Sequence, residues 1–178
     1  MESFKSFVKT HKKINIFDFD DTLCFTDSKI RLKTAEEVKE FSPKEFHELN
    51  ISYNDDSFEI DFSDFKELIK PKLNNIVVKI FKERLQEKEE TIILTARAEI
   101  QPIYDFFKKF NLPKVKVFSS EDKGAFILNL IDKDKFNDIE YYDDHTGFIN
   151  DAKYIREIRP KINFKIYLID AQGIPNEI

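Results

Sequence analysis

Cysteine and glycine are scarce in this sequence, and each shortage excludes a class of protein. Cys24 is the one cysteine among 178 residues, so the chain can form neither an intramolecular disulfide nor a multi-cysteine zinc site, which is consistent with a reducing compartment. The three glycines, Gly124, Gly147 and Gly173, lie too far apart for a GxGxxG or a GxxxxGK(S/T) loop. A dinucleotide fingerprint and a P-loop are therefore excluded.

Long apolar runs and several catalytic motifs are missing as well. No segment reaches the roughly 18 apolar residues that span a bilayer, and the first residues include no apolar stretch of signal-peptide length. We therefore expect a cytoplasmic protein with no membrane partner. A GxSxG elbow and an HExxH motif are absent, and the three histidines are widely separated, so an enzyme built on this sequence would depend on carboxylates.

A surplus of positive charge is also lacking. The sequence has 29 Lys and Arg against 34 Asp and Glu, a formal net charge of -5. A general basic field that would attract nucleic acid is therefore excluded, although a local basic patch is not. We expect no strong binding to duplex nucleic acid. The composition otherwise fits a globular protein, since 41% hydrophobic residues stand beside 35% charged ones.

Short β-rich runs alternate with helical patterns along the chain, which predicts an α/β fold with a parallel sheet. The length fits a single domain over residues 1–178. Five strands are predicted, at residues 14–19, 91–95, 115–118, 139–142 and 163–169. Four helices are predicted between them, at about residues 74–88, 99–111, 124–132 and 147–158.

Residues 25–73 interrupt this rhythm and form a predicted insertion after the first strand. Thr34 with Glu37, and Ser42 with Glu45, have the spacing of capping boxes, so two short helices are expected. Apolar and acidic residues then alternate, which indicates a short strand at Phe58, Glu59, Ile60, Asp61 and Phe62.

This insertion has two interpretations. It is cap-like, a lid over a site, or it is a loop excursion that packs away from any site. No linker rich in Pro, Gly or Ser separates it from the rest of the chain, so we expect it to be part of the same domain.

Two aspartates lie at the end of the first predicted strand, in the motif FDFDDTL. A buried carboxylate is tolerated only where cations or hydrogen-bond donors hold its charge. Because residues i and i+2 of a strand face the same way, Asp18 and Asp20 are expected to point at one place beyond the carboxyl end of the sheet. Ligands of open α/β sheets bind at that end. The alternative is chance, since a DxD pattern is expected somewhere among 34 acidic residues.

A second acidic pair, Asp143 and Asp144, follows the fourth predicted strand. Two carboxylate clusters at one sheet edge would repel each other unless a hard cation lies between them. Mg²⁺ is the natural occupant because it prefers oxygen ligands and pairs carboxylates with phosphate. The alternative is that Asp144 caps the following helix, but capping does not explain both carboxylates.

Three further residues fit a phosphate site. Thr95 ends the second predicted strand, and its hydroxyl, with nearby amides and Arg97, could hold a phosphate oxygen. Lys123 opens a helix, where a cation opposes the helix dipole and so requires a negative partner. The alternative for Lys123 is an exposed side chain at a frayed helix start.

The order of these motifs resembles the haloacid dehalogenase-like (HAD) phosphohydrolase superfamily, over residues 12–24 and 74–170. The resemblance implies a three-layer, Rossmann-like parallel sheet of about five strands. It also implies Mg²⁺ held by Asp18, Asp20, Asp143 and Asp144. His145 follows the acidic pair where the family more often has a glycine-containing motif, so the direct metal ligand of that pair stays open. The implied roles are nucleophile for Asp18, general acid/base for Asp20, phosphate binding for Thr95, charge neutralisation for Lys123 and metal binding for Asp143.

These roles predict a Mg²⁺-dependent phosphomonoester hydrolase that acts through an aspartyl-phosphate. Asp20 favours this class, because the family's dehalogenases lack an acid at that position and its transport ATPases have threonine there. Two alternatives stay open. One is a phosphotransferase such as a mutase, and the other is an inactive module of the same fold that binds phosphate.

The substrate is predicted only by class. TAR at residues 95–97 and YDDH at residues 142–145 resemble the 3′-phosphatase module of phage-type polynucleotide kinase-phosphatases, which implies a nucleotide or a nucleic-acid 3′-phosphate end as partner. A small phosphorylated metabolite is the other candidate. Aromatic residues of the insertion could stack on a base or simply pack, namely Phe25, Phe41, Phe46 and Tyr53.

Overall fold

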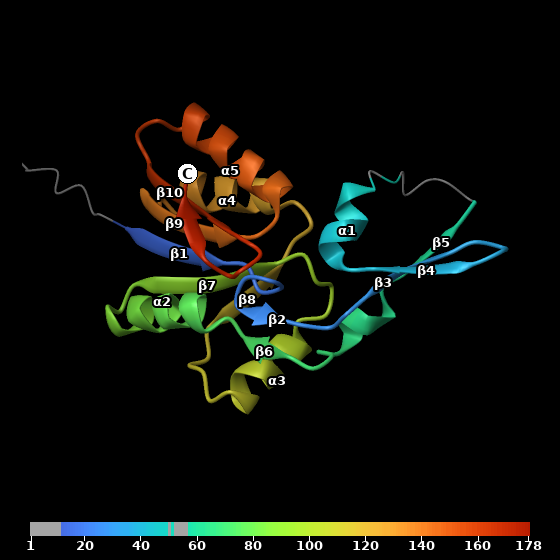
Figure 1. Cartoon of the computed structure of the whole chain (residues 1–178). Coiled ribbons are helices and arrows are strands. Elements are labelled where there is room, and N and C mark those ends of the chain that lie inside the picture. The colour runs from blue at the N-terminus through green and yellow to red at the C-terminus, as the bar shows by residue number, and fades with distance from the viewer. Residues whose placement is uncertain (1–11, 50, 52–56) are drawn as a thin grey trace, which may run out of the picture.

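The computed structural model describes residues 12–49, 51 and 57–178, and these form a mixed α/β fold around a mainly parallel sheet (Figure 1). Within this part of the chain the sheet has six strands in the order β11-β10-β9-β1-β7-β8. β11 alone pairs antiparallel, with β10. The strands are β1 (Lys13–Phe17), β7 (Glu90–Thr95), β8 (Lys116–Ser119), β9 (Asp138–Asp143), β10 (Asn163–Ile169) and β11 (Pro175–Glu177).

Four helices cover the two faces of this sheet, two on each (Figure 1). α2 and α3 bury Phe81 and Phe106 in one apolar core, and α4 and α5 bury Ile127 and Ile149 in the other. Burial of these apolar faces is the main stabilising contribution to such a layered fold. The helices are α2 (Asn75–Gln86), α3 (Gln101–Lys109), α4 (Lys123–Asp132) and α5 (Thr146–Ile158).

The five strands and four helices predicted from periodicity are confirmed to within a few residues. β11 is a sixth strand that the sequence pattern did not indicate, because its three residues, Pro-Asn-Glu, show no apolar alternation. β1 also ends earlier than predicted, at Phe17, so Asp18 and Asp20 lie beyond the strand. Among the described helices none combines the length and apolar character of a membrane span.

The insertion between β1 and α2 has a small sheet of its own, in the order β4-β3-β5 (Figure 1). This sheet is antiparallel, and helix α1 follows β4. A separate short ladder, β2 with β6, closes the base of the insertion where it joins the core. The elements are β2 (Cys24–Phe25), β3 (Ile30–Lys33), β4 (Val38–Phe41), α1 (Pro43–Glu48), β5 (Glu59–Asp61), the 3-10 helix η1 (Ser63–Lys66) and β6 (Lys72–Leu73).

One of the two helices predicted in the insertion is wrong. Thr34 and Glu37 form the turn between β3 and β4, where the Thr34 hydroxyl accepts hydrogen bonds from the amides of Glu36 and Glu37. A threonine side chain closes a turn with the same hydrogen bonds that it offers to a helix start, so the pattern did not discriminate the two. The second capping box is confirmed, since Ser42 and Glu45 cap α1 reciprocally. The predicted strand near Ile60 is β5.

Candidate functional site

The carboxyl ends of β9, β1 and β7 meet at one edge of the sheet, because these strands are adjacent and parallel. Asp18 follows β1, Asp143 ends β9 and Thr95 ends β7. The Asp18 amide donates to the Tyr142 carbonyl at 2.8 Å, which continues the pairing of β1 with β9 one residue past the strand. Residues distant in sequence are thereby brought to one place.

A tight turn at residues 19–24 follows Asp18. The amides of Leu23 and Cys24 both donate to the Phe19 carbonyl at 3.0 Å, and Asp21 has a positive φ of 52°. Aspartate tolerates this left-handed conformation better than most residues. The turn leads the chain from β1 into β2 (Cys24–Phe25).

Lys123 lies between the two acidic motifs. Its Nζ is 2.6 Å from Asp18 Oδ1 and 2.8 Å from Asp143 Oδ2, and the side chain is 2% exposed. The ammonium also lies 4.4 Å from the centre of the Phe148 ring, a cation–π contact from α5. The expectation that a negative cluster holds this lysine at the start of α4 is confirmed, and the exposed alternative is wrong.

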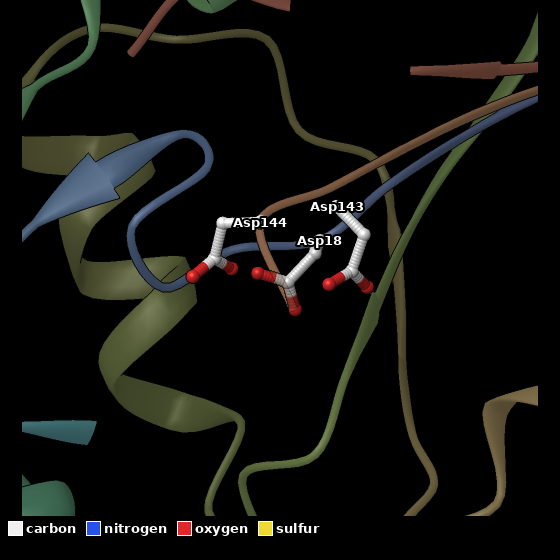
Figure 2. Close-up of side chains that lie close together, drawn as sticks. All are labelled: Asp18, Asp143 and Asp144. Atoms are coloured by element: carbon white, nitrogen blue, oxygen red, sulfur yellow. The ribbon is translucent and has the colours of Figure 1, made fainter. Parts of the chain in front are cut away.

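Three carboxylates gather beside this lysine (Figure 2). Asp18, Asp143 and Asp144 each offer an oxygen, and these oxygens lie within 4.8 Å of one another. Three ionised carboxylates exceed the single positive charge that Lys123 brings. Oxygen donors with an excess of negative charge fit a hard divalent cation, so this group is able to hold a metal such as Mg²⁺.

The oxygens of this group differ in their availability. Both Asp143 oxygens are engaged, Oδ2 by Lys123 and the Tyr141 hydroxyl and Oδ1 by the amide of His145. Among the residues that the structure describes, the Asp18 carboxylate accepts one hydrogen bond, from Lys123 to Oδ1. Within the described part of the chain, the Asp144 carboxylate accepts no hydrogen bond. Asp18 and Asp144 therefore have the free lone pairs.

The electrostatics of the site reflect crowded, buried negative charge. Burial, followed by the charges of Asp143 and Asp20, raises the pKa of Asp18 to about 7 in spite of Lys123. Burial and then Asp18 and Asp143 raise the pKa of Asp144 well above its usual range. Both shifts mean that the ionised forms need more positive charge than the protein supplies.

The same negative charge raises the pKa values of two neighbouring groups, Lys123 and Tyr141. Burial alone would lower the pKa of Lys123, but Asp143 and Asp18 together raise it well above the ordinary lysine range, so Lys123 is cationic. Burial and the nearby Asp143 charge raise the pKa of Tyr141, which therefore keeps its proton and donates a hydrogen bond to Asp143.

Asp20 is paired with an arginine. Arg97 binds it bidentately, with Nε and Nη2 each 2.6 Å from one carboxylate oxygen. The structure brings oxygens of Asp18, Asp143 and Asp144 within 4.8 Å of one another, and the Asp20 charge is near enough to raise the pKa of Asp18. Asp18 and Asp20 both lie beyond β1, which ends at Phe17, so strand alternation does not set the directions of their side chains. That the two point at one place stays a prediction.

Thr95 and Arg97 lie at the turn after β7. The Thr95 hydroxyl, on a 1% exposed residue, accepts from the Arg97 amide at 3.1 Å. The Thr95 carbonyl accepts from the Ser120 amide, and the Arg97 carbonyl accepts from the Ser119 hydroxyl at 2.6 Å. This turn is thus tied to the end of β8. Whether Thr95 and Arg97 bind phosphate stays a prediction.

The site also contains residues that were not predicted. Tyr141 shares a face of β9 with Asp143, and strict strand alternation could have placed its hydroxyl there. His145, not Asp144, is the N-cap of α5, and Gly147 gives its ring room, since a Cβ there would lie 2.8 Å from His145 Cε1. No sequence signal indicated that Phe148 lies against Lys123.

The aromatic residues proposed for base stacking belong to apolar contacts instead. Phe46 is 3% exposed and packs between the rings of Phe41 and Phe62. Phe25 lies against Gly173, within 2.9 Å of where a Cβ would stand. Packing therefore accounts for these residues. Tyr53 lies outside the described residues.

Comparison with known proteins gave no match to a family model, a curated protein or a solved structure. The function of the chain has to be inferred from its own residues.

Proposed function

We propose that the chain is a Mg²⁺-dependent phosphomonoester hydrolase with a Rossmann-like, HAD-type fold. The observation that carries this proposal is the Lys123 bridge, in which one buried ammonium contacts Asp18 and Asp143 with Asp144 beside them. A lone structural ion pair would need one carboxylate. A second and a third carboxylate are expected where a cation and an anionic substrate are to be bound.

The three carboxylates fit Mg²⁺ by donor type and by charge. Asp18 and Asp144 would hold it with their free oxygens, while Asp143 would orient Lys123. When bound, the ion supplies positive charge that lets an anionic nucleophile approach an anionic phosphate. The reducing cytoplasm is the proposed location, which suits the buried free thiol of Cys24.

In the first chemical step, an Asp18 carboxylate oxygen attacks phosphorus and forms the new P–O bond of an aspartyl-phosphate. The bond from phosphorus to the substrate oxygen breaks, and its electron pair stays on that oxygen. Asp20 gives the departing oxygen a proton, so the product leaves as an alcohol. Lys123 and the Thr95 hydroxyl would stabilise the negative charge of the phosphoryl oxygens in transit.

In the second step, water attacks the phosphorus of the aspartyl-phosphate. Asp20, now ionised, takes a proton from this water. The bond between phosphorus and the Asp18 oxygen breaks, which returns the Asp18 carboxylate and releases inorganic phosphate. Asp20 is protonated again at the end, so protons balance over the cycle.

The proposed substrates are nucleotides, nucleic-acid 3′-phosphate ends or small phosphorylated metabolites. The pairing of the basic side chains on β3 favours small ligands or chain ends as substrates and disfavours long duplexes. Arg31 is paired with Asp64 and Glu40, and Lys33 with Asp61 and Glu59, so neither offers a free charge to a phosphate backbone.

The test is phosphate release by purified protein from p-nitrophenyl phosphate and a broad panel of phosphorylated metabolites, with Mg²⁺ or with EDTA. We expect activity with Mg²⁺ only, and loss of at least about 10³-fold in Asp18→Asn, which removes the nucleophile. Asp105→Asn is the matched control, because Asp105 is exposed on α3 and contacts Gln101. Full activity of Asp18→Asn would contradict the proposal.

A further inference from the structure

Arg97 makes contacts in two directions. On one side, Nε and Nη2 bind the two oxygens of Asp20, each at 2.6 Å. On the other side, Nη1 donates to the carbonyls of Phe65 at 2.8 Å and Glu67 at 3.4 Å, both in the insertion. One guanidinium therefore joins the turn after β1 to the insertion.

The guanidinium is committed to these partners. Its side chain is 2% exposed, and its Cζ lies 4.9 Å from the centre of the Phe65 ring. An arginine has five N–H donors, and four are used in the bonds to Asp20, Phe65 and Glu67. Little of the group is left to bind a substrate phosphate, which is the role that the sequence predicted for Arg97.

The insertion end of this contact is itself anchored. Phe65 belongs to η1, and the neighbouring Asp64 accepts from Arg31 Nη1 at 2.7 Å and from the Lys29 amide at 3.0 Å. Arg31 lies on β3, the central strand of the insertion's sheet. A continuous path of contacts thus runs from β3 through η1 and Arg97 to Asp20.

We propose that Arg97 is a positioning residue that couples the insertion to Asp20, so that the position of the Phe65–Glu67 turn controls how well Asp20 serves the leaving group. The inference rests on the proposed function, in which Asp20 is the proton donor. A rigid bidentate pair fixes the plane of the carboxylate as well as its distance, which a lysine cannot do. The insertion thereby regulates turnover without contacting the reacting atoms.

This coupling makes a specific kinetic prediction. Phenyl phosphate releases phenoxide, a strong base that needs a proton as it leaves, whereas 2,4-dinitrophenyl phosphate releases a weak base that does not. A misplaced Asp20 lowers kcat for the first substrate and spares the second. A general loss of structure, or loss of a phosphate ligand, lowers activity on both.

The first arm of the experiment measures kcat and KM for both substrates in Arg97→Lys, Phe65→Ala and the double variant. We expect kcat on phenyl phosphate to fall about 10²-fold in Arg97→Lys and about 10-fold in Phe65→Ala, with less than about threefold change on the dinitrophenyl ester. The double variant should be no worse than Arg97→Lys, since both changes act through one contact.

The matched control for Phe65→Ala is Phe118→Ala, which truncates an exposed ring on β8 that packs against Phe126. Phe118→Ala should leave the ratio of the kcat values for the two substrates unchanged. Equal losses on both substrates, additive losses in the double variant, or a rise in KM alone would each overturn the proposal, the last because it identifies Arg97 as a substrate ligand.

The second arm does not depend on activity. Hydrogen exchange is measured in Asp20→Ala, which alters the far end of the contact. We expect exchange at residues 62–67 to rise about tenfold, including the Phe65 amide that donates to the Phe62 carbonyl, while β9 keeps its protection. Unchanged exchange at residues 62–67 would overturn the coupling. If the wild type hydrolyses neither ester, the proposed function fails, and this arm alone decides the inference.

Discussion

Lys123 Nζ lies 2.6 Å from Asp18 Oδ1, although the two residues are 105 positions apart in the sequence. The same ammonium holds Asp143 at 2.8 Å, and both carboxylates are buried. Because a buried charge without a partner is strongly unfavourable, the Lys123 ammonium stabilises the two buried carboxylates. The site and the stability of the sheet edge are therefore linked.

Replacing this lysine tests the link. Lys123→Met keeps the length of the side chain and removes its charge, which leaves Asp18 and Asp143 facing each other. We expect the free energy of unfolding in EDTA to fall by about 3 kcal/mol. Urea unfolding at pH 7.5 measures this. Lys116→Met is the control, since Lys116 is 73% exposed and should change stability by less than about 0.5 kcal/mol. An equal effect of the two changes would contradict the prediction.

The raised pKa of Asp18, about 7, predicts a pH dependence of stability in the absence of metal. An unfolded aspartate has a pKa of about 3.9, so the folded state holds the proton more tightly. The stabilising contribution of this group is therefore complete below pH 4 and is lost as the pH rises to 7. Asp18→Asn is neutral throughout, so it should exceed the wild type by ~1–3 kcal/mol at pH 8 and by less at pH 5.

Urea unfolding in EDTA at the two pH values gives this difference. Asp105→Asn, on the exposed face of α3, should follow the wild type at both. A difference that does not change between pH 5 and pH 8, or a less stable Asp18→Asn at pH 8, would show that the Asp18 carboxylate is not strained by burial.

Asp143, which ends β9, and Asp144, which follows it, should behave differently toward Mg²⁺. Asp144 accepts no hydrogen bond within the described residues and is half-buried, so Asp144→Asn should fold normally and weaken Mg²⁺ binding about tenfold or more. Asp143→Asn disturbs Lys123, Tyr141 and the His145 amide, so it should lower stability first. Thermal unfolding over a Mg²⁺ titration separates the two effects. Equal Mg²⁺ stabilisation of wild type and Asp144→Asn would contradict the assignment.

Gly173 is predicted to be the least replaceable glycine. Its φ is +78°, and a Cβ would lie 2.7 Å from Asn74 Nδ2. Asn74 also donates to the carbonyls of Thr22 and Gly173, so a shift would reach the turn after Asp18. Gly173→Ala should cost about 1–3 kcal/mol and lower activity, whereas Gly124→Ala, in a helix with ordinary contacts, should be neutral or stabilising. Urea unfolding of both variants is the measurement, and similar values would refute the prediction.

Nucleic acid should be bound weakly and through its ends. The net charge is -5, and the Arg31 and Lys33 side chains are paired with acids. The logarithm of the affinity for duplex DNA falls with the logarithm of the salt concentration, with a slope of about 0.9 for each neutralised phosphate. Binding that depends on a few such contacts is therefore weak at moderate salt. A competition assay with a 3′-phosphorylated oligonucleotide, a nucleoside monophosphate and a sugar phosphate ranks the substrates. Sub-micromolar binding of blunt, unphosphorylated duplex at about 150 mM salt would contradict this prediction.

The parallel sheet was predictable from the sequence because short, continuous apolar runs such as β7 alternate along the chain with helical patterns such as α2. The gathering of Asp18, Lys123 and Asp143 was predictable for a related reason. Each lies at the end or start of a readable element, and parallel strands place such ends along one edge.

The features that sequence alone missed depend on contacts between segments. Nothing local indicates that Arg97 faces Asp20 and the Phe65 carbonyl, because the partners lie 77 and 32 positions away. The Thr34 turn was mistaken for a helix start because its side-chain bonds are the same in both. β11 is too short and polar to be recognised, and it exists because β10 offers it an edge.

The central place of β1 in the sheet has a consequence for synthesis. β1 is made first, yet its two neighbours, β7 and β9, come from residues 90–95 and 138–143. On a ribosome that adds about 5–20 residues per second, β7 is complete roughly 4 to 16 seconds after β1, and until then both edges of β1 are open. The insertion, whose strands β3, β4 and β5 are all within residues 30–61, can pair meanwhile. During this interval the nascent chain has a paired insertion next to an unpaired β1. We expect a chaperone to bind β1 at this stage.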